Sequence, residues 1–116
     1  MKKIHKEMPM KECLRLMFRS NNIIISSDGL ASNEFIFVYG CKAYYEDGGC
    51  LGSFTKTMDI LDSQEWTHTH KWYIAGILNN DEVEAINDMM RRHLYYNTLC
   101  IEDKLKTILN TREVDL

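Results

Sequence analysis

The clearest apolar pattern of the chain begins just after its one proline, Pro9. Apolar side chains then recur at spacings of three and four residues through Phe18, which is typical of an amphipathic helix that buries one face. Proline suits the first turn of a helix, where a backbone N–H has no partner to lose. The pattern therefore predicts a helix over residues 9–19, ended by the polar turn SNN at residues 20–22.

The middle of the chain has the composition of β-strands separated by glycine turns. A strand is expected to begin at IIIS, residues 23–26, and residues 34–54 then mix β-branched and aromatic side chains with glycines, which is typical of a hairpin. Cys41 and Cys50 flank the glycine-rich turn. Because the sequence has no Cys-x-x-Cys pair, free thiols are favoured over a zinc site or a disulfide, although pairing of these two cysteines stays open.

The stretch EWTHTHKWYI, residues 65–74, is the most chemically suggestive part of the sequence. It follows TMDILDS, residues 57–63, whose composition predicts a short helical turn. The alternation of EWTHTHKWYI predicts a strand that ends near Gly76, and side chains two residues apart on a strand share one face. The residues that we expect on that face are Trp66, His68, His70, Trp72 and Ile74.

Two histidines one residue apart on a strand raise the question of a metal site. His68 and His70 would project to the same face, as the metal-binding pair does in His-x-His barrel enzymes. A metal needs a third ligand, and the spacing of the remaining histidines, His5 and His93, does not predict that they converge on this pair. We therefore favour a partly exposed sheet face, and predict neither a metal nor another cofactor. A small metal-dependent enzyme built on His68 and His70 is kept as an alternative.

Beyond residue 78 the apolar spacing changes from that of a strand to that of a helix. Apolar residues recur at helical spacing from Val83 to Leu94, after the sequence NND at residues 79–81, which offers an N-cap and early acidic side chains. The apolar residues among 101–109 suggest a second helix that ends near residue 110. The C-terminal region is therefore expected to be helical.

Together these elements predict an α+β fold, in which an N-terminal helix packs on a four- to five-stranded antiparallel sheet and two C-terminal helices follow. A chain of 116 residues is close to the usual size of one domain, so we expect a single domain over residues 1–116. Within it, residues 1–78 would form the helix and sheet core and residues 79–116 a helical appendage. Whether these helices pack on the sheet or bind a partner stays open.

Charge and apolar content exclude several classes of protein. Fourteen Lys and Arg against seventeen Asp and Glu give a net charge of −3 with no basic block, which argues against binding of duplex DNA through its phosphates. The longest apolar runs are far shorter than the roughly 20 residues that span a bilayer. The N-terminus carries the positive charge of a secretion signal without its apolar segment. We therefore expect no membrane span and a cytoplasmic location.

The residues indicate binding more than catalysis. The cysteines, histidines and carboxylates show no local nucleophile signature, and the glycines match no phosphate-binding fingerprint. Aromatic side chains on a sheet can stack on a nucleobase and arginines can pair with a phosphate, although burial in the core and a solvated helix face are competing interpretations. The candidate ligand-binding residues are Tyr44, Trp66, His68, His70, Trp72, Arg91 and Arg92.

Three segments combine into a recognisable order of features: a short helix, a hairpin that contains EDG, and a DIL turn that leads into an acidic residue and a tryptophan. They are MKECLRLMFRS (residues 10–20), FIFVYGCKAYYEDGG (35–49) and DILDSQEW (59–66). This order resembles a family of small phage-encoded proteins that includes the Thoeris anti-defence sponges. The stretch NNIIISSDGL (21–30) departs from the family, which has Gly-Lys, an Arg and a Trp there, and the region from residue 79 has no counterpart.

The resemblance implies a helix-plus-antiparallel-sheet homo-oligomer of the host-cell cytosol that is not an enzyme and that sequesters a cyclic nucleotide immune signal. Aromatic side chains such as Tyr44 and Trp66 would then hold the base, while Arg91 and Arg92 would hold the phosphate. The alternative expectation is an inhibitor that binds a host defence protein through its C-terminal helices.

Overall fold

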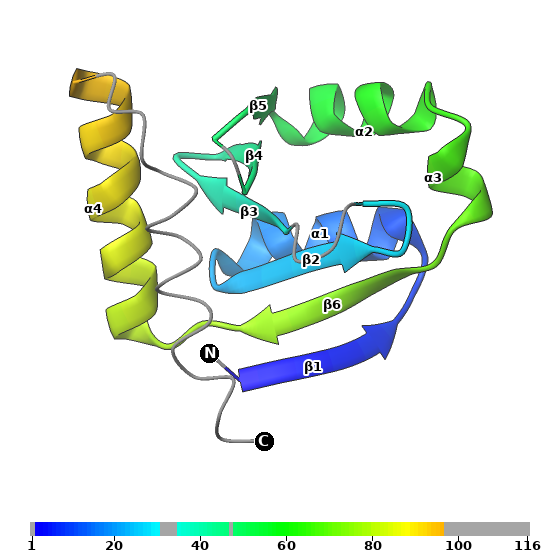
Figure 1. Cartoon of the computed structure of the whole chain (residues 1–116), viewed down its shortest axis with the longest axis horizontal. Coiled ribbons are helices and arrows are strands. Elements are labelled where there is room, and N and C mark those ends of the chain that lie inside the picture. The colour runs from blue at the N-terminus through cyan, green and yellow to red at the C-terminus, as the bar shows by residue number, and fades with distance from the viewer. Residues whose placement is uncertain (1, 31–34, 47, 97–116) are drawn as a thin grey trace.

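The computed structural model describes residues 2–30, 35–46 and 48–96 (Figure 1). These residues form four helices and one antiparallel sheet of six strands in the order β1-β6-β2-β3-β4-β5. The helices are α1 (Met10–Ser20), α2 (Phe54–Asp62), α3 (Trp66–Thr69) and α4 (Asn80–Tyr96). The strands are β1 (Lys2–Glu7), β2 (Ile23–Ser27), β3 (Ile36–Tyr39), β4 (Lys42–Tyr45), β5 (Cys50–Gly52) and β6 (Trp72–Ile77). The predicted α+β class is confirmed, whereas the prediction of four to five strands was too low.

The central strands β6, β2 and β3 bury side chains on both faces, because they consist mostly of consecutive apolar residues, and the two serines that end β2 are buried as well. β2 lies between β6 and β3, with Ile25 opposite both Ile74 and Ile36. Successive side chains of a strand point to opposite faces. Ile24 and Ile25 accordingly belong to two different core clusters, one on each side of the sheet.

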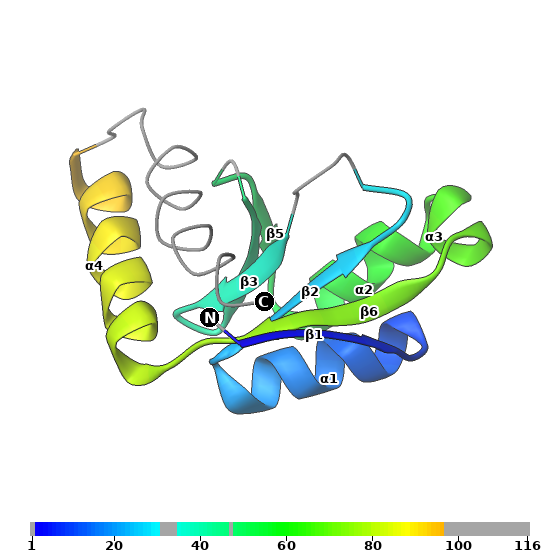
Figure 2. The ribbon, with the colours of Figure 1, turned by 60° about the horizontal axis from the view of Figure 1, so that its bottom comes forward.

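One face of the sheet is covered by α1 and α2. Figure 2 shows α1 lying beneath β6 and β2. Its apolar stripe consists of Cys13, Leu14 and Met17, all fully buried against Ile25 and other residues of that face. The N-terminal helix is thus not the first element, since β1 precedes it, and it shares its face of the sheet with α2.

The other face packs against α4. Ile86, Met89 and Met90 are buried there in one cluster with Ile24 and Phe37 of the sheet. The described part of α4 therefore contributes to the core, which answers the question left open by the sequence for this helix. The second expected C-terminal helix lies outside the described residues.

The start of α4 confirms one of the N-cap candidates. The Asn79 side chain accepts a hydrogen bond from the Glu82 backbone N–H at 2.8 Å, and the Glu82 carboxylate accepts one from the Asn79 N–H at 3.0 Å. This reciprocal pair is a capping box, which satisfies two backbone donors at the helix end. Glu82 is only 4% exposed, so the first turn of α4 is held firmly where it meets the sheet.

One segment was left without a predicted element and another was assigned wrongly from the sequence. The charged sequence KKIHKE of β1 has no apolar pattern, yet it pairs with β6 at the edge of the sheet, where lysines are common. Residues 66–69 form a helical turn, and the strand begins only at Trp72 and continues past Gly76 to Ile77. Only the last three residues of EWTHTHKWYI, residues 72–74, therefore belong to a strand.

The hairpin of β3 and β4 turns at Gly40 and Cys41, and the later glycines lie in the connection that joins β4 to its antiparallel partner β5. Both residues have positive φ, 56° and 62°, which suits a two-residue turn whose twist matches that of the strands. Cys41 lies in this turn, while Cys50 pairs with Tyr44 in the next ladder. Both cysteines are free and exposed, as the sequence favoured.

Truncation of Met90 tests whether α4 is part of the core. Met90→Ala removes a fully buried side chain, and we expect the free energy of unfolding to fall by about 2–5 kcal/mol in urea denaturation. Glu84→Ala, on the exposed side of the same helix, is the matched control and should change it by less than about 0.5 kcal/mol. Equal and small effects of both substitutions would show that α4 does not pack on the sheet in solution.

Candidate functional site

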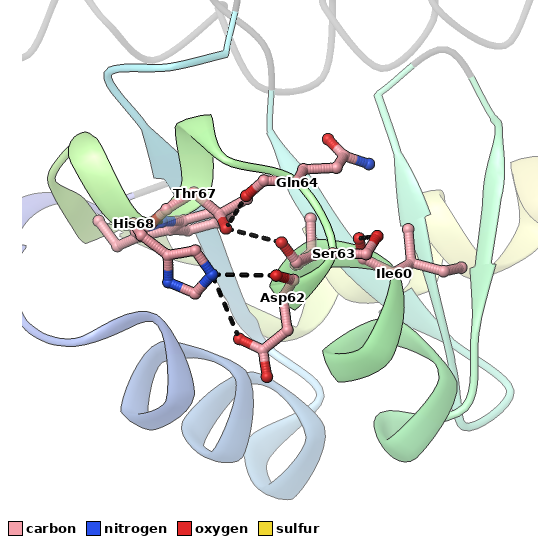
Figure 3. A network of polar contacts seen from close by, with 8 residues as sticks. Ile60, Asp62, Ser63, Gln64, Thr67 and His68 are labelled. Atoms are coloured by element: carbon pink, nitrogen blue, oxygen red, sulfur yellow. Dashed lines mark hydrogen bonds and ion pairs between the residues drawn. The ribbon is translucent and has the colours of Figure 1, made fainter.

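The site begins with the unexpected helical turn α3, which is bound to the end of α2. The Thr67 hydroxyl lies 2.6 Å from the Leu61 carbonyl, in the last turn of α2, and 2.7 Å from the Gln64 carbonyl just beyond it (Figure 3). It donates its proton to these carbonyls, which also accept the Gln64 and Thr67 backbone N–H groups. Thr67 is 3% exposed. These hydrogen bonds stabilise a helical turn in a segment whose side-chain pattern alone predicts a strand.

Two stacked tryptophans connect this turn to the sheet, since Trp66 belongs to α3 and Trp72 to β6. The Trp66 and Trp72 rings are 5.7 Å apart with an interplanar angle of 20°. Trp72 is 3% exposed, and its Nε1 donates to the Thr67 carbonyl at 3.0 Å. Trp66 is only partly buried. Trp72 is therefore mainly a core residue, and Trp66 is the member of the pair that reaches the surface.

The two histidines do not share a sheet face, which corrects the expectation from the sequence. His68 Nε2 lies 3.0 Å from the Asp62 carbonyl and 3.9 Å from the Asp62 carboxylate, at the end of α2 (Figure 3). His70 Nδ1 lies 3.0 Å from the Trp66 carbonyl. Both side chains are exposed. Because residues two apart on a helical turn point in different directions, the two rings use different partners.

A groove of about 610 Å³ runs between the start of α1 and the connection from α3 to β6. One wall is the segment from the end of β1 into α1, and the other is the segment from α3 into β6. Lys71 Nζ and Glu7 Oε2 approach to 3.7 Å, and both side chains are exposed. The lining residues are Glu7, Met8, Pro9, Met10, Thr67, His68, Thr69, His70, Lys71 and Trp72. We call this feature the α1–α3 groove.

The remaining predicted ligand residues lie elsewhere. Tyr44 is 4% exposed in the cluster beneath α4, where burial raises the pKa of its hydroxyl, so it stays neutral at ordinary pH. Arg91 and Arg92 are exposed on α4, at the opposite end of the molecule from α3 (Figure 1). Within one chain, the structure therefore does not bring Tyr44 and both arginines together with Trp66.

The structure supplies groove residues that the sequence did not suggest. Glu7, Met8 and Met10 enter the α1–α3 groove because β1 pairs with β6 and delivers the start of α1 beside Lys71. No local pattern of KKIHKE indicates that pairing. Gly29 was also missed: a Cβ added to it would collide with the Trp66 ring, so the loop after β2 needs glycine to sit against that ring.

No group of three or more potential metal-binding side chains gathers among the residues that the structure describes. The side chain of His93 and all of Cys100 lie outside that part of the chain.

The described cysteines differ sharply in their exposure: Cys13 is buried, whereas Cys41 and Cys50 are exposed. Cys13 is fully buried on the side of α1 that packs on the sheet, and burial raises the pKa of its thiol to about 12. Since the thiolate is the reactive form, Cys13 is unsuited to be a nucleophile at neutral pH.

Comparison with known proteins gives no relative for this arrangement. No protein-family model, curated protein or solved structure matches the chain. Within the described residues, no helix is both long and apolar enough to cross a membrane.

A double-mutant cycle tests the contact between Gly29 and Trp66. Gly29→Ala should lower the free energy of unfolding by about 1–3 kcal/mol, because the new methyl group overlaps the ring. In a Trp66→Leu background the same substitution should cost clearly less, since the overlapping ring atoms are gone. Equal costs of Gly29→Ala in both backgrounds, measured by urea denaturation, would contradict this contact.

Alkylation tests the assignment of the thiols. In the native protein at pH 8, iodoacetamide should modify the exposed Cys41 and Cys50 within minutes and leave Cys13 unmodified, as read by peptide mass spectrometry. Burial disfavours the charged thiolate of Cys13. Its labelling should therefore rise only well above neutral pH or after unfolding in urea. Labelling of all three at one rate in the native state would contradict the buried position of Cys13.

Proposed function

We propose that this protein is a non-enzymatic binding protein of the phage anti-defence type, which sequesters a cyclic nucleotide signal in the α1–α3 groove. The groove itself is the observation that carries the proposal. Its volume of about 610 Å³ suits a nucleotide-sized ligand, since small-molecule sites generally measure about 300–1,000 Å³. Sequestration requires binding groups only, and these are what the lining residues offer.

The lining combines the two kinds of group that a nucleotide requires. Lys71 provides a cation for the phosphate, and the exposed imidazoles of His68 and His70 add hydrogen-bonding nitrogens beside it. Met8 and Met10 provide an adaptable apolar wall for the base. In this arrangement Trp66 supports the site through its stack on Trp72, and Tyr44 and both arginines play no part.

Glu7 places a negative charge beside Lys71, and its effect on the binding of an anion can be measured. Its carboxylate lies 3.7 Å from the Lys71 ammonium and would compete with a phosphate for it. Both groups are exposed, so the pair itself adds little to stability. Removal of either charge should therefore change anion binding without unfolding the protein.

The competing function, inhibition of a host defence protein through the C-terminal helices, draws no specific support from α4. Its buried apolar residues Ile86, Met89 and Met90 face the sheet and are not available to a partner. The oligomeric state implied by the resemblance stays a prediction.

Nucleotide binding is best measured by the protein's own fluorescence. The only two tryptophans of the chain, Trp66 and Trp72, adjoin the groove, so a bound ligand should change their emission. We would titrate a cyclic mononucleotide, a cyclic dinucleotide and cyclic ADP-ribose. For whichever of the three nucleotides binds, Lys71→Gln should raise the dissociation constant about tenfold or more, because it removes the cation. Glu7→Gln should lower the dissociation constant several-fold.

The control is Lys56→Gln, which neutralises an exposed lysine of α2 outside the groove and should change the affinity less than twofold. Mass spectrometry of the nucleotide after incubation should recover it intact. No binding of any of the three ligands, or equal effects of the two lysine substitutions, would contradict the assignment of the α1–α3 groove as the nucleotide site. Conversion of the nucleotide would instead overturn the non-enzymatic part.

A further inference from the structure

A second hollow lies at the other end of the molecule, between α4 and the turn that joins β3 to β4. In both views of the ribbon this turn lies beside α4 (Figures 1 and 2). The hollow has a volume of about 260 Å³. It is lined by Asn21, Val38, Tyr39, Gly40, Val83, Asn87 and Arg91. We call it the α4 slot.

The α4 wall of the slot is a stripe of side chains four residues apart. Val83, Asn87 and Arg91 stand above one another on one side of the helix, because residues i and i+4 share a face. Polarity therefore increases along the slot, from an apolar side chain through an amide to a guanidinium. Such a gradient suits a ligand with an apolar part and an anionic part.

The opposite wall is built from two turns of defined geometry. Asn21 ends α1 with a left-handed conformation, φ 60°, and its N–H donates to the Met17 carbonyl at 3.3 Å. Gly40 has φ 56° in the hairpin turn. A separate small void of about 10 Å³, about the size of one water molecule, shares Asn21, Val38, Val83 and Asn87 with the slot and is also lined by Ile24, Phe37 and Ile86. The slot therefore lies next to the apolar core residues that line this void.

The two arginines of α4 differ in their surroundings. Arg92 pairs with Asp88 at 3.1 Å, one helical turn earlier. Arg91 lines the slot and makes no ion pair with any residue of the described part of the chain. A guanidinium can bind a carboxylate through two parallel hydrogen bonds, and Arg91 has this capacity unused within that region.

We propose that the α4 slot is a second binding site, separate from the α1–α3 groove, for a small carboxylate with an apolar tail, whose carboxylate pairs with Arg91 and whose tail lies against Val38 and Val83. The Asn87 amide, between these two groups, is placed to donate to the second carboxylate oxygen. The proposal does not depend on the function assigned to the α1–α3 groove, which lies at the other end of the molecule.

Amide chemical shifts measured while butyrate is added test the site directly. In ¹H–¹⁵N spectra of the full chain, sodium butyrate should shift residues of the slot with a dissociation constant on the order of 1 mM, as expected for a ligand of this size. Arg91→Gln should weaken binding by about tenfold or more. Arg92→Gln is the matched control, because it removes the same charge one residue away and should change the affinity less than twofold.

A comparison of butyrate with inorganic phosphate distinguishes a specific site from general attraction of anions to α4. It carries the anionic charge without the tail, so it should bind the slot at least about fivefold more weakly than butyrate. Absence of saturable shifts with butyrate would overturn the proposal. So would equal weakening by the two arginine substitutions, or equal binding of phosphate and butyrate, because both results would indicate attraction by net charge alone.

Discussion

Burial of the central strands on both faces is the constraint on which the rest of the structure depends. Apolar side chains of β6, β2 and β3 point to both sides of the sheet. Ile24 and Ile25, for example, are buried on opposite faces. Helices α1 and α2 cover one side and α4 the other. Because burial of apolar area is the main favourable term in folding, a chain with these strands requires helices on both sides. Packing of α4 on the sheet therefore follows from the apolar strands that precede it.

The two hollows follow from this arrangement. The α1–α3 groove forms where α1 begins and α3 ends, beside the edge pairing of β1 with β6. The α4 slot forms where α4 passes the β3–β4 turn. Each contains exposed cationic or imidazole groups above apolar side chains. Since they lie at opposite ends of the molecule, a ligand at one site need not affect the other through direct contact (Figure 1).

In the connection from α2 to β6, local hydrogen bonds stabilise a structure that differs from the one that the side-chain pattern predicts. Period-two alternation over EWTHTHKWYI predicts a strand, but the Thr67 hydroxyl reaches the carbonyls at the end of α2, and Trp72 Nε1 reaches the Thr67 carbonyl. These contacts stabilise a helical turn before the strand begins. His68 and His70 thereby lose the shared face that made them a candidate metal pair, and His68 instead lies beside Asp62.

The sequence by itself determined the elements whose pattern is local: the amphipathic helix after Pro9, the strand at IIIS, the hairpin after Phe35 and the capped helix that begins beyond Asn79. It also placed the groove residues His68, His70 and Trp72 among the candidates. Only the tertiary structure decided that KKIHKE is a strand, that Tyr44 is buried, and that Arg91 lines a hollow distant from Trp66. The reason is physical: charge and alternation describe neighbours along the chain, whereas edge pairing, helix-end hydrogen bonds and the choice of sheet face depend on residues far away in sequence.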